Sequence, residues 1–246
     1  MKRILIVGAT STIAAACARV WSTEGARFFL VARDAVRVKQ LADDLLVRGA
    51  KEAHVHILDV TQTAGLSAMF DRCYESLRGV DIALLAHGIL SDQQACQLDV
   101  DATLLEFATN ASSVAALLTI LSGRMAASGS GTIAVISSVA GDRGRASNYT
   151  YGATKAAVTA YCEGLRARMY SKGVHVLTIK PGPVATPMTA GTNIPSFLVA
   201  APERVAQDIV KAVEGRVSTL YTPWFWRPVM AIIRALPEPI LRRLPV

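Results

Sequence analysis

The chain has 246 residues, of which 52% are hydrophobic, and its formal net charge is +7. A chain of this size and composition can bury a large core without disulfides or metals. Its four cysteines form no C-x-x-C pair. We therefore expect buried thiols, with neither a disulfide framework nor a metal site.

The first residues carry basic side chains followed by an apolar run, as a secretory leader does. The run ends at Gly8, however, and is shorter than the roughly 7–15 apolar residues that a leader requires. A first β-strand is the better interpretation, and no stretch approaches the ~18 uninterrupted apolar residues of a membrane span. We therefore expect a cytoplasmic protein.

Strand-like and helix-like segments alternate along the chain. Short runs rich in Val, Ile and Leu predict seven strands, at 4–7, 27–31, 53–58, 81–86, 132–137, 175–179 and 219–221. Helical periodicity predicts helices at 13–24, 35–48, 66–77, 98–127, 151–171 and 202–214. This alternation implies right-handed β-α-β units. The expected fold class is α/β: one doubly wound Rossmann-type domain over residues 1–222 with a mostly parallel seven-stranded sheet, then a short helical and amphipathic extension over residues 223–246.

The first predicted strand ends in a turn that holds Gly8, Thr10, Ser11, Thr12 and Ile13 and leads into a helix. A strand–turn–helix of this kind directs backbone N–H groups and a helix N-terminus at a pyrophosphate. Gly8 alone remains of the usual glycine fingerprint, so this motif by itself is weak evidence for a nucleotide site.

The second predicted strand ends in Ala32-Arg33. The acid that would grip a ribose 2′-hydroxyl is missing, and Arg33 stands beside its place, where it can pair with the 2′-phosphate of NADP. In isolation, Arg33 is equally well explained as a solvated surface charge. Asp59 follows the third strand and is a candidate acceptor for the adenine amine, a helix N-cap, or both.

Ser138 ends the fifth predicted strand, and Tyr151 and Lys155 follow at a spacing that puts them on one helix face. An ammonium beside a phenol is expected to lower the phenol pKa from about 10, which makes Tyr151 a general acid near neutral pH. Ser138 lies at the carboxyl end of a strand, where ligands bind in open α/β sheets, and can donate to a carbonyl oxygen.

Over nearly its whole length the chain resembles the classical short-chain dehydrogenases/reductases. The resemblance implies that Tyr151 is the acid/base, that Lys155 holds the nicotinamide ribose and tunes Tyr151, and that Ser138 orients the carbonyl. It also implies that Asn110 anchors a water in a proton relay, although a helix-interior polar residue is the alternative. The segment 181–186 would hold the nicotinamide amide through the Val184 backbone and Thr186; it also fits a plain turn.

The full set of residues that we expect to bind NADPH combines these motifs. It comprises Gly8, Thr10, Ser11, Thr12, Ile13, Arg33, Asp59, Val60, Gly88, Tyr151, Lys155, Pro181, Gly182, Val184 and Thr186.

The chain departs from the family pattern at two places. Thr12 and Ala14 replace glycines of the fingerprint, and Ala14 still permits close helix–strand packing. Residues 85–88, Leu-Ala-His-Gly, replace Asn-Asn-Ala-Gly, which removes the amide groups that steady the central strand in the family. His87 either lines the cofactor edge or is a locally hydrogen-bonded loop residue.

The turn at Gly8, residues 141–148 and residues 227–246 are similar to one branch of the family, the decaprenylphosphoryl-2-keto-β-D-erythro-pentose reductases. This resemblance implies reduction of a keto-sugar carried on a polyprenyl phosphate. Arg143 and Arg145 follow the fifth strand and are candidates for pairing with the phosphate, or else solvated loop arginines.

Residues 216–246 hold five arginines and one acid, Glu238. A basic, aromatic segment is typical of contact with an anionic surface, and the chain shows no nucleic-acid recognition motif. We expect peripheral contact with the inner face of a membrane, because four prolines break the segment into helices too short to span it. Packing in a homodimer or homotetramer is the alternative. The apolar side chains available for either role are Trp224, Phe225, Trp226, Val229, Met230, Ile232 and Ile233.

Two other functions remain open. A soluble reductase of an acyl-thioester, a steroid or a small ketone would share the catalytic residues but would have no use for the basic, aromatic extension. A non-catalytic cofactor-sensing protein would account for the altered turn, whereas the intact Ser138, Tyr151 and Lys155 argue against it.

Overall fold

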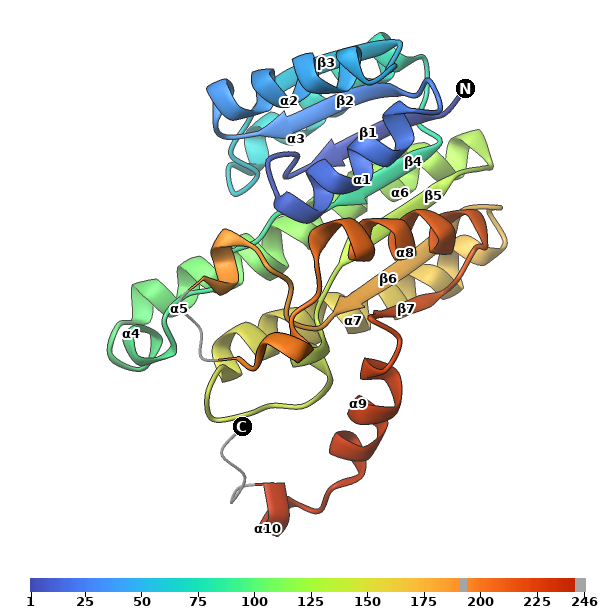
Figure 1. Ribbon diagram of the computed structural model, residues 1–246. Helices are drawn as coiled ribbons and strands as arrows, with labels where there is room; N and C mark the ends of the chain where they lie inside the picture. Colours follow the sequence, from blue (N-terminus) through green and yellow to red (C-terminus); the bar gives the residue numbers. More distant parts are fainter. Residues whose placement is uncertain (191–193, 242–246) are drawn as a thin grey trace.

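The computed structural model describes residues 1–190 and 194–241 (Figure 1). Seven parallel strands form one sheet in the order β3-β2-β1-β4-β5-β6-β7, which confirms the predicted α/β fold. The strands are β1 (Arg3–Val7), β2 (Arg27–Ala32), β3 (Glu52–Ile57), β4 (Ile82–Leu85), β5 (Thr132–Ile136), β6 (His175–Pro181) and β7 (Thr219–Thr222).

Helices cover both faces of the sheet. One face packs against α1 (Thr12–Ser22), α2 (Ala35–Val47) and α8 (Pro202–Glu214). The other packs against α3 (Leu66–Leu77), α6 (Ser113–Ser128) and α7 (Tyr149–Tyr170). Because both faces are buried, the central strands β1, β2, β4 and β5 are hydrophobic at nearly every position instead of at alternate ones.

Strand β1 contributes to both layers of the core. Ile4 and Ile6 belong to one hydrophobic cluster and Leu5 and Val7 to the other, and all four are fully buried. The period of two along a strand sends successive side chains to opposite faces. A single five-residue strand therefore anchors both helical layers and fixes where its carboxyl end, at Val7, emerges.

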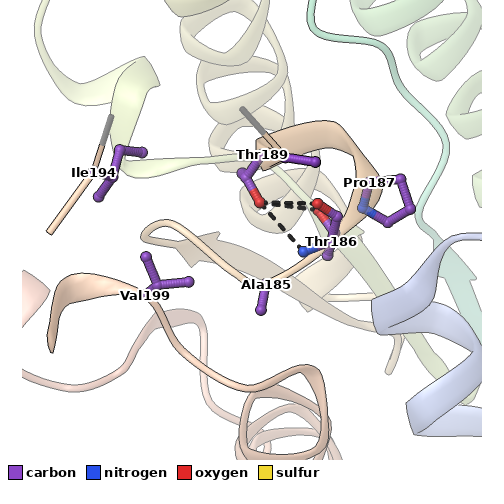
Figure 2. Close-up of a pocket in the computed structure, with 7 residues that line it drawn as sticks. Ala185, Thr186, Pro187, Thr189, Ile194 and Val199 are labelled. Atoms are coloured by element: carbon purple, nitrogen blue, oxygen red, sulfur yellow. Dashed lines mark hydrogen bonds between the residues drawn. The ribbon is translucent and has the colours of Figure 1, made fainter. Parts of the chain in front are cut away.

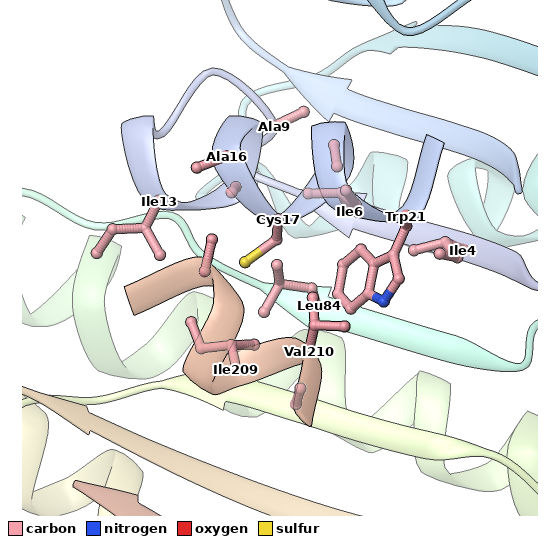
Figure 3. Packing of buried hydrophobic residues seen from close by; sticks show 14 of the residues in the cluster. Ile4, Ile6, Ala9, Ile13, Ala16, Cys17, Trp21, Leu84, Ile209 and Val210 are labelled. Atoms are coloured by element: carbon pink, nitrogen blue, oxygen red, sulfur yellow. The ribbon is translucent and has the colours of Figure 1, made fainter. Parts of the chain in front are cut away.

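Helix α1 crosses α8 over the first of these clusters (Figure 3). Cys17 and Trp21 of α1 face Ile209 and Val210 of α8. The α1 sequence is rich in alanine, and such small side chains allow the helix to approach its neighbours closely. The four cysteines are free and buried, and the described residues contain no cluster of three metal-ligating side chains.

The prediction of a single helix over residues 98–127 is wrong in detail. The structure has α4 (Gln93–Leu98), α5 (Val100–Phe107), a π-helical turn (Ala108–Ser112) and then α6. The break before α5 occurs because the carboxylate of Asp99 accepts a 2.8 Å hydrogen bond from the backbone N–H of Asp101 and starts a new helix.

The helical run Val100–Ser128 is long and apolar enough to cross a membrane by length and composition alone. Its fully buried side chains, which include Leu117, Leu118 and Leu121, belong to the second core cluster beneath the sheet. Packing within the domain therefore accounts for the apolar character of α6, whereas Val100, Leu104 and Leu105 of α5 are exposed.

The C-terminal extension (residues 223–246) contains α9 (Trp226–Ala235) and α10 (Glu238–Leu241). Pro228 does not interrupt the chain as expected, because it lies in the first turn of α9, where a helix makes no use of the backbone N–H. Pro237 does fall at a break, between α9 and α10. The last five residues of the predicted extension lie outside the described part of the chain.

Candidate active site

The parallel sheet brings the turns that follow β1, β4, β5 and β6 to one edge. At this edge lie Gly8, Gly88, Ser138 and Gly182, each within a few residues of the end of its strand. Ligands of open α/β sheets bind at this edge. The structure thus collects the predicted residues from segments more than 170 positions apart.

The turn after β1 has the geometry of an anion site. Gly8 has a φ of +79°, and a Cβ at this position would lie 2.5 Å from the backbone nitrogen of His87. The backbone N–H groups of Gly8 and Ala9 donate to the Val31 carbonyl at 2.9 and 3.0 Å, which holds the turn against β2. Glycine is therefore required here both by conformation and by space.

Helix α1 begins at Thr12, immediately after this turn, and the side chain of Ser11 makes no hydrogen bond to cap it. The N–H groups of the first turn have no partner within a helix, and the helix dipole favours negative charge there. Thr10, Ser11, Thr12 and Ile13 therefore surround a position suited to a pyrophosphate. Thr12 is bulkier than the glycine it replaces, and its effect on the approach of a cofactor remains a prediction.

The ends of β2 and β3 place Arg33 and Asp59 side by side, with Arg33 Nη1 3.9 Å from Asp59 Oδ2. Asp59 accepts hydrogen bonds from the backbone and the hydroxyl of Thr61, and these bonds lower the pKa of its carboxyl. Asp59 thus forms a local turn and is no helix cap, while Val60 beside it is buried. The Arg33 side chain is 65% exposed, so it remains available to a ligand.

A second arginine lies at the same place, and the sequence analysis missed it. Arg37 of α2 donates to the Thr10 carbonyl at 3.4 Å, which brings its guanidinium to the cofactor turn. The intervening acid, Asp34, accepts the Arg37 backbone N–H at 3.0 Å as the N-cap of α2. Arg37 follows Arg33 by four residues, and this spacing was the signal in the sequence.

Ser138, Tyr151 and Lys155 meet at the end of β5. Ser138 is buried, and its Oγ accepts the Ala140 backbone N–H at 3.1 Å. Lys155 is buried too; its Nζ donates to the Ile136 carbonyl at 3.2 Å and lies 5.6 Å from the centroid of the Tyr151 ring. The structure therefore brings the three residues together as expected.

The pKa values of these groups differ from the expectation. Burial raises the pKa of Tyr151 to about 12, and the neighbouring Ser138 hydroxyl opposes this rise. Burial lowers the pKa of Lys155 to about 8. The predicted lowering of the phenol pKa is therefore wrong for this structure, because loss of hydration, reinforced by the negative charge of Glu106, outweighs the Ser138 hydrogen bond. A phenol that stays protonated still suits a proton donor.

Asn110 lies in the π-helical turn, fully buried. Its side-chain amide receives the Ile89 N–H and donates to the Ile89 carbonyl, both at 2.8 Å, and donates to Glu106 at 3.2 Å. Both donor hydrogens of the amide are thus used to hold the loop after β4. Its role in a proton relay remains a prediction.

His87 is a locally hydrogen-bonded residue. Its Nε2 lies 2.9 Å from Ser113 Oγ, which itself donates to the Thr109 carbonyl at 2.7 Å. Burial lowers the pKa of His87 to about 3, so the ring is neutral. This chain of bonds ties the loop after β4 to the π-helical turn and stands in for the missing amide groups of the family motif.

The segment that follows β6 lines a cavity of about 430 Å³. Figure 2 shows this cavity, in which Thr186 and Thr189 are joined by hydrogen bonds, among them Thr186 N–H to Thr189 Oγ1 at 3.2 Å. Val184 is buried and pairs with Ala200 as an isolated bridge. The lining residues are Ala185, Thr186, Pro187, Thr189, Ala190, Ile194 and Val199.

The C-terminal extension packs onto the same segment. A Cβ on Gly182, which follows Pro181, would overlap the indole ring of Trp226. Met230, one turn later in α9, is buried. Met230 is therefore covered by the domain and the half-buried Trp226 packs against the segment after β6, whereas Trp224 and Ile232 are 73% and 65% exposed.

Comparison with known proteins agrees with this geometry. Residues 2–195 match the family described as short chain dehydrogenase. The chain is 33% identical, over 98% of its length and 96% of the relative's, to an uncharacterised oxidoreductase of Mycobacterium tuberculosis. It is 27% identical to the ketoacyl reductase HetN of Nostoc, over 88% of this chain and 77% of that protein. A solved short-chain dehydrogenase/reductase family protein superposes with a TM-score of 0.77 at 29% identity, covering 90% of this chain and 97% of the other.

The fold and the site together define an oxidoreductase with a dinucleotide-binding domain. This chain belongs to the short-chain dehydrogenase/reductase family, whose members use a nicotinamide cofactor, NAD or NADP.

If the phenol is the proton donor, as the resemblance implies, Tyr151→Phe is expected to lower carbonyl reduction at least ~100-fold and to leave cofactor binding nearly unchanged. Turnover of a panel of ketones and cofactor affinity, measured on the same preparations, check both parts. Tyr149→Phe is the matched control, since Tyr149 is an exposed tyrosine on the same helix. Substantial turnover by Tyr151→Phe would refute this assignment.

Proposed function

We propose that the protein is an NADPH-dependent reductase that converts a carbonyl to an alcohol. The observation that carries this proposal is the buried group of Ser138, Tyr151 and Lys155 at the carboxyl end of β5. The preference for NADPH is supported by Arg33 and Arg37, two cations that flank the place where the 2′-phosphate of NADP would lie.

When bound, a nicotinamide cofactor would supply the hydride to the carbonyl carbon. Tyr151 donates its proton to the carbonyl oxygen, where negative charge develops. Because its pKa is about 12, the phenol is protonated before the reaction at neutral pH. The Ser138 hydroxyl beside it orients the same oxygen. The Lys155 ammonium stabilises the phenolate that remains and binds the ribose. A site shielded from water strengthens each of these interactions.

For the cofactor, we expect Arg33→Ala to weaken NADPH binding roughly tenfold or more while leaving NADH binding unchanged, because only NADPH carries the phosphate that the guanidinium would pair. Dissociation constants for both cofactors, measured by fluorescence titration, test this. Arg48→Ala is the control, since Arg48 lies at the C-terminal end of α2 and is already paired with Asp44. Equal affinity of the wild type for both cofactors would overturn the preference.

We further propose that the substrate carries a phosphate, as a keto-sugar on a polyprenyl phosphate does. Arg145 supports this proposal. It lies between Ser138 and Tyr151 in the sequence, its Nε is buried, and its side chain has no hydrogen-bonding or ionic partner among residues 1–190 and 194–241. Burial lowers the pKa of its guanidinium, and a bound phosphate would offset that cost. Arg143, by contrast, pairs with Glu238 of α10 at 3.0 Å.

The alternative substrate is an acyl-thioester. HetN, which is similar to this chain, is a ketoacyl reductase. A keto-acyl substrate would use the same catalytic residues. It gives no role to the exposed aromatic and aliphatic side chains of the C-terminal extension.

To distinguish these substrates, we expect Arg145→Ala to raise the KM for a polyprenyl-phosphate-linked keto-pentose roughly tenfold or more, and to leave the KM for a neutral cyclic ketone unchanged. Arg143→Ala is the matched control, because Arg143 already has a carboxylate partner. A preference of the wild type for keto-acyl thioesters would favour the alternative. Equal effects of Arg145→Ala on both kinds of substrate would contradict a phosphate contact.

We also propose that the enzyme is cytoplasmic and contacts the inner face of the membrane through its C-terminal extension. Trp224 and Ile232 expose large apolar surfaces, and Arg227 and Arg234 of α9 are exposed beside them. Basic residues near an anionic leaflet contribute about 1 kcal/mol each at most, so binding would be reversible and weakened by salt. Packing of the same side chains in a homodimer or homotetramer is the competing explanation.

Flotation with anionic vesicles is the direct measurement of membrane contact. We expect the protein to float with them at low salt, to float less at high salt, and to lose the association in the double variant Trp224→Ala/Ile232→Ala. Val47→Ala is the control, since Val47 is an exposed apolar residue on α2, away from the extension. No flotation at low salt, with a concentration-dependent oligomer that the double variant disrupts, would assign these side chains to subunit packing.

A further inference from the structure

Glu106 is a buried acid at the active site that the sequence analysis did not select. It lies on α5, one helical turn before Asn110, and is only 1% exposed. Its Oε1 accepts from Asn110 Nδ2 at 3.2 Å, and its Oε2 accepts from the Ser91 backbone N–H at 3.2 Å and from Cys96 Sγ at 3.9 Å. None of these partners carries a charge.

The contacts indicate that the Glu106 side chain is ionised. A carboxylate accepts hydrogen bonds only, whereas a protonated carboxyl must also donate one. All three neighbours of Glu106 are donors, and no acceptor is found for a carboxyl proton among the described residues. Burial of an isolated charge is costly, so the fold accommodates this one for a reason other than packing.

The carboxylate connects to Lys155 through the loop that follows β4. A Cβ on Gly88 would lie 3.0 Å from Asn110 Oδ1 and 3.5 Å from Lys155 Nζ. The amide of Asn110 and the ammonium of Lys155 therefore border the same point of the loop, where the side chain of residue 88 would lie. Glu106 holds the Asn110 amide in place from its other end, because its Oε1 accepts a hydrogen bond from Asn110 Nδ2.

We propose that Glu106 is a positioning residue of the active site: it fixes Asn110 and the loop after β4, and it places a buried negative charge behind Asn110, which lies beside the Lys155 ammonium at Gly88. The inference rests on the role of Lys155 in the function proposed above. It is independent of which carbonyl compound the enzyme reduces.

The electrostatic part follows from the titratable groups that interact with Lys155. These are Tyr151 on its own helix, whose ring lies 5.6 Å from Lys155 Nζ, His87 from the loop after β4, and Glu106 of α5, which acts from behind Asn110. Tyr151, with a pKa of about 12, and His87, with a pKa of about 3, are both neutral near pH 7. Burial lowers the pKa of Lys155 to about 8, and Glu106 opposes that fall. Without the charge on Glu106, Lys155 would lose its proton at a lower pH.

The test follows NADPH affinity as a function of pH and requires no substrate. In the wild type, binding should weaken as the pH rises through about 8, because the ammonium that holds the ribose is lost there. In Glu106→Gln the midpoint should move to lower pH by about one unit, with affinity at pH 6 nearly unchanged. Glu106→Asp, which keeps the charge, should restore the wild-type midpoint. Asp44→Asn removes a carboxylate from the surface between α1 and α2 and should have no effect.

A thermal melt at each pH separates loss of the fold from loss of the ammonium. If Glu106→Gln does not fold, Glu106→Met serves instead, because it removes the charge and fills the volume without a buried amide. A lower melting temperature with an unchanged pH midpoint would overturn the proposal and make Glu106 a structural residue. Turnover by Tyr151→Phe tests only the proposed reaction, whereas the pH dependence of NADPH binding tests only the role of Glu106. The proposed function and the proposal for Glu106 can therefore fail separately.

Discussion

Seven strands that run in the same direction bring their carboxyl ends to one edge of the sheet. The positions of the residues at the candidate active site are set by that alignment. The cofactor turn, the serine, the tyrosine–lysine pair and the segment after β6 come from distant parts of the sequence. They meet because each follows a strand whose position is set by two buried layers of aliphatic side chains. The chemistry is local, but its geometry is a property of the whole core.

Features with a short-range cause were predictable from the sequence. Alternation of apolar runs and helical periodicity indicated the parallel sheet, because each strand had to be covered on both faces. Tyr151 and Lys155 share a helix face by the geometry of one turn. Helix α8 (Pro202–Glu214) lies where its periodicity predicted, since a proline begins it and its apolar face is regular.

Features that arise from tertiary contact were not predictable. The pKa of Tyr151 depends on how completely its surroundings exclude water, which no motif records. The function of Glu106 depends on a loop from another part of the chain. Asp99 is an intermediate case, because its capping role has a local signal, an acid two residues before the amide it binds, that the strong apolar periodicity around it obscured.

The contact between Gly182 and Trp226 links the C-terminal extension to the segment that lines the cavity. Because a side chain at position 182 would occupy the space of the indole ring, these two positions can change in one order only: the aromatic residue must become smaller first. The same holds for engineering. A chimaera that receives the extension of a relative must also receive the matching residues after β6, since the two segments form one steric unit.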